Sequence, residues 1–319
     1  MPCQKRFYLC FMNYYVYFFL FILSLMLTYL TQKIFVFYKK FDDINHRSSH
    51  KTLATRTGGI GVFSSLLIVS SYYYFSEIEL FDYSLFIPLS VMFIVGVYDD
   101  FYSADFKMKF FLQIIVAKII IDQGYVITNY HGLFGLYEVP WILAQLTTLF
   151  VFLLIVNAIN FIDGIDGLAI TESIKTILLI EFFSASSTAL TKSGIMVVLS
   201  LIPLYYFNFK KSQKVFLGDS GSLLLGTIVS IYIFYVLGNE YEFKESFQLN
   251  KTLFAIIVLI YPLVDLLRVF ILRIKKGKSP FKPDNNHIHH LLINKNKSHV
   301  KSIIIIQFIS IFIILLIYA

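Results

Sequence analysis

The chain has 319 residues, of which 57% are hydrophobic and only 15% are charged, and its formal net charge is +7. A water-soluble core cannot bury that much apolar surface, so the composition excludes an ordinary soluble domain. A basic balance can indicate nucleic-acid binding, but most Lys and Arg lie between hydrophobic stretches on one predicted side of a bilayer, which argues against a nucleic-acid partner.

Hydrophobic stretches of near-spanning length recur along the whole chain. A helix needs roughly 20 apolar residues to cross a bilayer, and most of these stretches approach that length. We therefore predict an all-α integral membrane protein, a polytopic bundle of about ten transmembrane helices that forms a single domain over residues 1–319. The uncharged stretches are 7–30, 57–76, 83–98, 139–162, 193–209, 220–239 and 302–319, and the weaker candidates are 107–121, 168–186 and 252–272.

The positive charges fix the predicted orientation. With the first helix running from outside to inside, the inside segments 31–57, 208–214 and 273–301 carry most of the Lys and Arg. The positive-inside rule then places these loops in the cytoplasm. Lys5 and Arg6 make the first helix resemble a signal peptide, but the apolar run is too long and no small-residue cleavage site follows.

The first inside loop is polar and basic and then becomes rich in glycine. Arg47, His50 and Arg56 precede Gly58-Gly59-Ile60-Gly61 at the start of the next hydrophobic stretch. Glycines at a helix entrance permit close backbone approach and leave N–H groups that can face an anion. We expect a phosphate to dock there, and the three basic side chains are candidates for binding it.

The second inside loop contains two adjacent carboxylates, Asp99 and Asp100, followed by Lys107 and Gln113. Two neighbouring carboxylates repel each other, and a divalent cation or a cationic partner relieves the repulsion. A hydrated acidic turn is the alternative for an Asp-Asp pair on its own. We take both aspartates as catalytic candidates and Lys107 as a phosphate-binding candidate.

The third inside segment has polar residues at every third position. Residues at this spacing share one helix face, and buried polar residues in membranes are usually functional. Glycines after the third and fourth polar residues suggest that the helix breaks there. Asp163 is a catalytic candidate, and the substrate-binding candidates are Asn157, Asn160 and Asp166.

The fourth inside loop places Asp219 between Gly218 and Ser220-Gly221-Ser222 at the start of an uncharged stretch. An Asp at this position can simply cap the helix. The flanking small residues also expose backbone N–H groups beside the carboxylate, which suits a metal-bound phosphate. We take Asp219 as a catalytic and metal-binding candidate.

The fifth inside loop contains Asp284 followed by His287, His289 and His290. Zinc is one interpretation of such a cluster, but no Cys lies nearby and the companions are oxygen ligands. Binding of a phosphate by these side chains fits better.

Two further pairs of opposite charge are spaced three residues apart on predicted helices. They are Glu172 with Lys175 and Asp265 with Arg268. This spacing is typical of ion pairs within a helix, so we assign both pairs a structural role.

Taken together, these segments resemble the polyprenyl-phosphate N-acetylhexosamine-1-phosphate transferase family, which is related to the phospho-N-acetylmuramoyl-pentapeptide transferase. The resemblance spans residues 42–291, and its His-Ile-His-His form is similar to the branch that starts O-antigen, common antigen and teichoic acid synthesis. It rests on the motifs Gly96-Val97-Tyr98-Asp99-Asp100 with Lys107 and Gln113, Asn157-Ala158-Ile159-Asn160, Asp163-Gly164-Ile165-Asp166-Gly167, Gly218-Asp219-Ser220-Gly221-Ser222, and Asp284 with His287-Ile288-His289-His290.

The resemblance implies transfer of a sugar 1-phosphate from a UDP-N-acetylhexosamine to undecaprenyl phosphate, with release of UMP, as the first step of a cell-surface polysaccharide. It implies Mg²⁺, or Mn²⁺, on Asp219 with Asn160 close by, and phosphate contacts from Lys107 and the three histidines. Asp99 is expected to position or deprotonate the lipid phosphate, and Asp100 to support the metal or a basic partner. The expected location is the inner cell membrane, in the lipid bilayer, with a cytoplasmic active site, and a homodimer is common in this family.

A polytopic transporter with a cytoplasmic phosphate or metal site is the alternative function. Transporters place ionisable groups near the bilayer midplane and often consist of repeated halves. Here the polar motifs crowd the predicted membrane rim and the chain has no internal repeat, so we favour the transferase.

Overall fold

The computed structural model describes residues 2–42, 53–78, 82–133, 135–277, 287–296 and 298–318. Arg47, His50 and Asp284, which the sequence analysis selected, lie outside the described residues.

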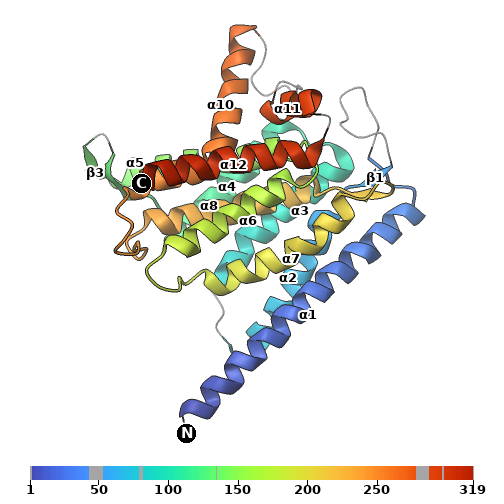
Figure 1. The fold of residues 1–319 in the computed structure, drawn as a ribbon, viewed down its shortest axis with the longest axis horizontal. Coiled ribbons are helices and arrows are strands. Elements are labelled where there is room, and N and C mark those ends of the chain that lie inside the picture. The colour runs from blue at the N-terminus through green and yellow to red at the C-terminus, as the bar shows by residue number, and fades with distance from the viewer. Residues whose placement is uncertain are drawn as a thin grey trace.

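The described residues are predominantly helical, as the hydropathy pattern predicts (Figure 1). The short strands and the 3₁₀ turn η1 occur in the connections. The helices are α1 (Pro2–Phe37), α2 (Gly58–Phe75), α3 (Phe86–Tyr102), α4 (Phe106–Asp122), α5 (Trp141–Ile162), α6 (Leu168–Phe183), α7 (Thr191–Asn208), α8 (Gly218–Leu237), α9 (Lys251–Val258), α10 (Ile260–Lys275), α11 (Ile288–Asn296) and α12 (His299–Tyr318). The other elements are β1 (Ala54–Thr55), η1 (Tyr83–Leu85), β2 (Asn129–Leu133), β3 (Leu136–Glu138) and β4 (Lys214–Val215).

Within the part of the chain that the structure describes, six helices are long and apolar enough to cross a membrane, namely α1, α2, α3 with η1, α5, α8 and α12. The count reaches seven if α9 and α10, which bend by 72° at their junction, form one span. Helices α4, α6 and α7 complete the bundle but do not meet the same test of length and composition. The class of membrane helical bundle is confirmed, and the total of about ten spans stays a prediction.

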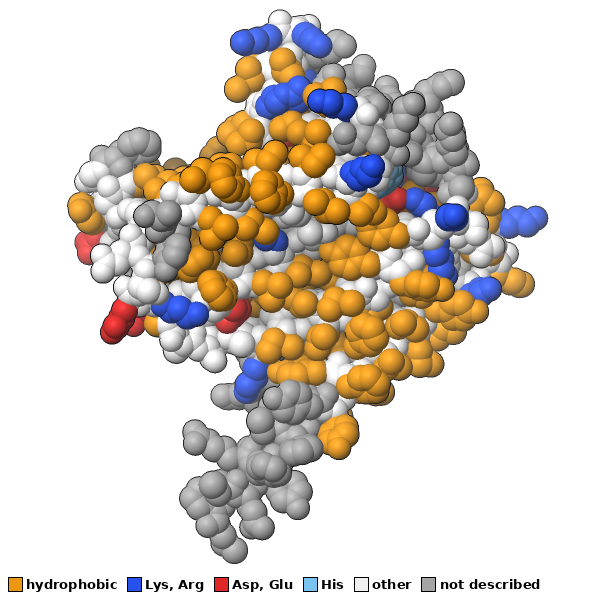
Figure 2. All heavy atoms as spheres, viewed as in Figure 1, with side chains coloured by type: hydrophobic (Ala, Val, Ile, Leu, Met, Phe, Trp, Pro, Cys, Tyr) orange, Lys and Arg blue, Asp and Glu red, His pale blue; other side chains and the backbone are white. Residues whose placement is uncertain are grey.

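The outer surface of the bundle suits a bilayer. Figure 2 shows hydrophobic side chains over the face made by α1, α6, α7 and α12, with most Lys and Arg toward the margins of that face. Many large apolar side chains on these helices are exposed, among them Phe182, Ile202, Phe308 and Phe312. Helix α10 projects away from the other helices (Figure 1).

Helix α8 is the central helix of the fold. It packs against α2, α3, α5 and α6, and 94% of its spanning window is buried. Small residues let the neighbouring backbones come close. A Cβ atom on Gly59 would lie 2.2 Å from Gly221 N, and one on Gly96 would lie 2.4 Å from Asp219 O. These contacts fix the start of α8 against the start of α2 and the end of α3.

A short parallel pairing of β1 with β4 joins the segments that precede α2 and α8, with Ala54 opposite Lys214. The ladder continues through Gly58 N–H, which donates to Phe216 O at 2.9 Å, and Gly59 N–H, which donates to Leu217 O at 2.8 Å. These N–H groups are therefore occupied by backbone carbonyls. The expectation that they face a phosphate is wrong, because the glycines serve helix packing instead.

Candidate active site

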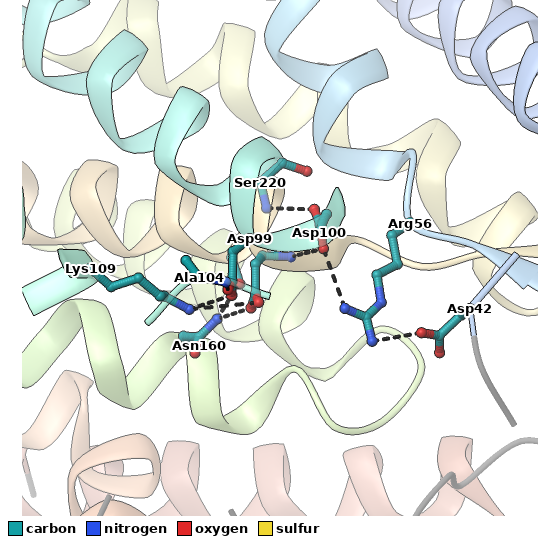
Figure 3. A network of polar contacts seen from close by, with 10 residues as sticks. Asp42, Arg56, Asp99, Asp100, Ala104, Lys109, Asn160 and Ser220 are labelled. Atoms are coloured by element: carbon teal, nitrogen blue, oxygen red, sulfur yellow. Dashed lines mark hydrogen bonds and ion pairs between the residues drawn. The ribbon is translucent and has the colours of Figure 1, made fainter. Parts of the chain in front are cut away.

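Five polar side chains from four helices meet at one end of the bundle, and four of them are labelled in Figure 3. Asp99 and Asp100 come from the last turn of α3 and Asp219 from the first turn of α8, while Asn160 ends α5 and Lys109 begins α4. We call these five residues the carboxylate cluster. The close approach of α3 to α8 at Gly96 brings the aspartates together from positions more than a hundred residues apart.

Asp100 caps the amino end of α8. Its Oδ1 accepts a hydrogen bond from Asp219 N–H and its Oδ2 one from Ser220 N–H, both at 2.9 Å, and the side chain is only 5% exposed. A carboxylate at a helix amino terminus is stabilised by the free N–H groups and by the helix dipole. The N–H groups that we expected to face a phosphate are thus taken by Asp100, which holds Asp219 in place.

Asp99 points toward α4 and α8. Its Oδ1 accepts from Ala104 N–H at 2.7 Å, and its Oδ2 pairs with Lys109 Nζ at 2.5 Å. Lys109 Nζ also lies 3.7 Å from Asp219 Oδ2, and the two carboxyl side chains contact each other. Carboxylates in contact require a shared proton or a cation between them. Lys109 supplies one positive charge for two such groups.

The two asparagines have different surroundings. Asn160 Nδ2 donates to Asp219 Oδ1 at 2.5 Å and to Ser222 Oγ at 2.8 Å. The amide therefore turns its N–H group, not its oxygen, toward Asp219, and the metal-ligand role predicted for Asn160 is not the arrangement in the structure. Asn157 Nδ2 donates to Gln113 Oε1 at 2.9 Å, so it links α5 to α4.

The lysine in the cluster is not the one selected from the sequence. Lys107 is exposed, whereas Lys109 is half-buried between Asp99 and Asp219. Helix register gives the reason. Lys109 lies one turn before the buried Gln113 and shares its inward face, whereas Lys107 lies two residues away on another face. The burial of Gln113, which only the structure shows, identifies Lys109 as the lysine that faces inward.

Arg56 links the first inside loop to the carboxylate cluster. Its guanidinium lies 2.6 Å from Asp42 Oδ1 and 3.7 Å from Asp100 Oδ1, and 42% of the side chain is exposed (Figure 3). The predicted phosphate-binding residue thus stands at the edge of the site.

The helix break predicted at the glycines is confirmed, because α5 ends at Ile162 and Gly167 adopts φ +78° before α6. Within the intervening loop, residues 163–167, Ile165 and Asp166 are buried and Asp163 is partly exposed. Burial, followed by the negative charges of Asp219 and Asp100, raises the pKa of Asp163 well above its ordinary value. Asp163 therefore holds a proton more tightly than an ordinary Asp.

Asp166, the last of the polar residues spaced three apart, contacts residues of β4 and α12. Its carboxylate pairs with Lys214 of β4 and with Nδ1 of His299, which lies 2.9 Å away at the start of α12. Burial alone would raise the pKa of Asp166, but hydrogen bonds from His299 and Lys214 outweigh it and lower that pKa. Neither Lys214 nor His299 was selected from the sequence.

The three histidines lie beside the 163–167 loop. A Cβ atom on Gly164 would lie 2.8 Å from His289 Nε2 and 3.3 Å from His290 Nε2. His287 and His289 are buried, whereas His290 is partly exposed, and the rings of His289 and His290 lie 4.4 Å apart. The fifth predicted motif therefore adjoins the third, as one site requires.

One of the two predicted intrahelical ion pairs is confirmed. Lys175 Nζ lies 2.5 Å from Glu172 Oε2 in a buried pair. Asp265 has partners beyond its own helix, because its carboxylate receives hydrogen bonds from His287 Nδ1 at 2.8 Å and from Ile288 N–H at 2.7 Å. Asp265 belongs to the histidine cluster.

Part of the chain matches a known protein family. Residues 83–237 match the model of glycosyl transferase family 4. That range contains the carboxylate cluster and the 163–167 loop, and it stops before the histidines.

Curated relatives align over most of the chain. A Bacillus subtilis (strain 168) protein named probable undecaprenyl-phosphate N-acetylglucosaminyl 1-phosphate transferase is 30% identical, with 89% of this chain and 78% of the relative aligned. The decaprenyl-phosphate N-acetylglucosaminephosphotransferase of Mycobacterium tuberculosis (strain H37Rv) is 32% identical over 82% of this chain and 70% of its own length. A Yersinia pestis undecaprenyl-phosphate alpha-N-acetylglucosaminyl 1-phosphate transferase is 27% identical, with 86% of this chain and 75% of the relative aligned.

Proposed function

The chain belongs to glycosyl transferase family 4, and we propose that it transfers an N-acetylhexosamine 1-phosphate from a UDP-sugar to undecaprenyl phosphate and releases UMP. N-acetylglucosamine is the first candidate sugar, since the relatives named above carry it in their names together with a polyprenyl phosphate. The reaction starts the synthesis of a cell-surface polysaccharide. The observation that carries the proposal is the contact of Asp99 with Asp219 beside Lys109.

The reaction brings two anionic groups together, the lipid phosphate and the donor pyrophosphate. The site therefore needs cationic groups, held in place by the protein, that offset the charge of the phosphates. Lys109 is held between two carboxylates, and Arg56 stands at the exposed edge. Both cations are positioned before a substrate binds, so they stabilise phosphate charge with little rearrangement.

The carboxylate cluster also fits a divalent cation. Asp99 and Asp219 are in contact and Lys109 lies beside both, while 26% of the Asp219 side chain remains exposed. Mg²⁺ binds through one or two carboxylates together with substrate phosphates, and Mn²⁺ accepts the same donors. Asp219 and Asp99 would hold the ion. When bound, it supplies a Lewis acid that polarises the pyrophosphate and offsets charge on the departing UMP.

The remaining groups divide the other tasks. Asp100 fixes the position of Asp219 by capping the start of α8. Lys109 fixes the position of Asp99, and Asp99 aligns the lipid phosphate. Asp163, whose pKa burial raises, is suited to accept and return a proton. The histidines at 287, 289 and 290 steady phosphate oxygens.

The position of the site suits a lipid substrate. The cluster lies where α3 and α5 end and α8 begins, so a phosphate at the membrane surface can reach it while its chain stays among the apolar outer faces. The basic loops orient this end toward the cytoplasm, where nucleotide sugars are made. We assign the protein to the inner cell membrane.

The test measures UMP release by purified protein supplied with undecaprenyl phosphate, Mg²⁺ and a panel of UDP-sugars. We expect activity with UDP-N-acetylglucosamine or a related N-acetylated donor and a loss of at least about 100-fold in Asp219→Asn. Asp122→Asn is the matched control, since Asp122 is an exposed carboxylate at the last residue of α4, where it pairs with Lys118 one turn before it. Absence of UMP with every donor would overturn the function and favour a transporter. Full activity in EDTA would overturn the metal assignment.

A further inference from the structure

A buried carboxylate on α10 organises the histidine segment. Asp265 is 0% exposed, and both of its oxygens are used, Oδ2 by His287 Nδ1 at 2.8 Å and Oδ1 by Ile288 N–H at 2.7 Å. His289 Nδ1 lies 3.6 Å from the same Oδ2. A buried carboxylate needs this many donors to offset its lost hydration. The side chain therefore ties α10 to the first turn of α11.

The contact with His287 determines which ring nitrogen is free. A carboxylate that accepts from Nδ1 fixes the proton on that nitrogen and the orientation of the ring, which leaves Nε2 for a ligand. The neutral ring then presents Nε2 as a hydrogen-bond acceptor, which suits a protonated phosphate oxygen.

Tyr261 makes a parallel contact with the next histidine. It precedes Asp265 by one helical turn, so the two side chains share one face of α10. Its hydroxyl lies 3.2 Å from His289 Nδ1. Among the described residues His289 Nε2 has no hydrogen-bond partner, although the side chain is fully buried, and this nitrogen lies against Gly164 of the 163–167 loop. A Tyr hydroxyl that donates to Nδ1 places the ring proton on Nε2, directed toward that loop.

We propose that Asp265 is a positioning residue of the transferase, which, with Tyr261, fixes the tautomer and direction of His287 and His289 so that their Nε2 atoms meet a phosphate of the substrate beside Gly164. The inference rests on the proposed function for its kinetic part. Its structural part, the tautomers of the two histidines, holds for the protein without substrate.

A bound metal is the rival explanation for this cluster. Asp265, His287 and His289 offer three ligand atoms within 4.8 Å of one another. The 2.8 Å separation of His287 Nδ1 from Oδ2 is an ordinary hydrogen-bond length, and Ile288 N–H occupies the other oxygen. Direct hydrogen bonding therefore explains the distances without an ion.

The first test compares the kinetics of Asp265→Asn with those of the wild type. We expect kcat to fall about 10- to 100-fold, with KM for the UDP-sugar changed less than about 3-fold. A purely structural defect would lower the folded fraction and leave kcat per folded protein unchanged.

Glu181→Gln is the matched control. Glu181 is also a carboxylate that accepts two hydrogen bonds, from Thr188 at 2.7 Å and Thr191 at 2.6 Å, at the opposite end of α6 from the site. We expect its kcat per folded protein to match the wild type. Equal losses of kcat per folded protein in the two variants would overturn the positioning role.

The second test needs no activity. Nitrogen-15 NMR of histidine-labelled protein in detergent reports the tautomer of each ring, and His287→Gln and His289→Gln assign the two signals. We expect His287 protonated at Nδ1 and His289 at Nε2, with the His287 signal altered in Asp265→Asn. Unaltered signals, or a bound metal lost in Asp265→Asn, would overturn the proposal. If the signals are altered but the wild-type protein releases no UMP, the proposed function is refuted and the tautomer assignment stands.

Discussion

Replacing Asp100 with Asn separates its capping role from a role in chemistry. The Asn oxygen accepts only one of the two N–H groups that Asp100 now receives from Asp219 and Ser220. A buried N–H left without an acceptor costs about 1 to 3 kcal/mol, and a lost charge at a helix amino terminus about 0.3 to 1 kcal/mol. Because the side chain is only 5% exposed, water replaces little of this. We expect the free energy of unfolding to fall by about 2 to 3 kcal/mol.

The assay pairs thermal unfolding in detergent with UMP release. Asp100→Asn should lower the melting temperature by several degrees, and activity should fall because Asp219 is no longer held. Asp99→Asn is the comparison, since Asp99 faces Lys109 and Asp219 and caps no part of α8. Its activity should fall further than that of Asp100→Asn, with a smaller loss of stability. An Asp100→Asn protein that melts with the wild type but is inactive would refute the capping role.

Three further changes test the rest of the site and its packing. Lys109→Gln should reduce kcat by at least about 100-fold, well beyond the effect of Lys107→Gln, and equal effects would contradict the register of α4. Burial, then the charges of His290 and His287, lowers the pKa of His289 well below its ordinary value, so below about pH 6.5 the unfolded chain takes up a proton that the folded chain does not. The contribution of His289 to stability should therefore fall between pH 7 and 5 by up to about 1.4 kcal/mol per unit, measured as the difference in slope between the wild type and His289→Gln. Equal slopes in the two proteins would contradict a buried neutral His289. Gly59→Ala places a Cβ 2.2 Å from a backbone nitrogen and should cost about 1 to 3 kcal/mol in a thermal melt, so a neutral substitution would contradict the close packing of α2 on α8.

The sequence predicted the chemical groups of the site better than their partners. Asp99, Asp100, Asn160 and Asp219 meet as their motifs suggested. Adjacent aspartates nevertheless have separate partners, since successive residues of a helix point about 100° apart. Asp99 therefore faces α4 while Asp100 reaches under α8.

The missed residues share a physical cause. Lys214 and His299 contact Asp166, and Asp265 contacts His287, across long sequence separations. Such contacts leave no local pattern, and a charged pair spaced i,i+3 suggested a nearer partner for Asp265. Lys109 was missed for a different reason. It shares the inward face of α4 with the buried Gln113, and burial is known only once helices pack.

Hydropathy and motif order determined that this chain is a helical membrane protein with its polar motifs at one end. The cost of placing a residue in hydrocarbon is local and nearly additive, so it can be summed along a sequence. Only the tertiary structure decided which nitrogen meets which carboxylate. Those hydrogen bonds depend on the rotation and depth of each helix, and the close contacts at Gly59 and Gly96 set both for the helices around α8.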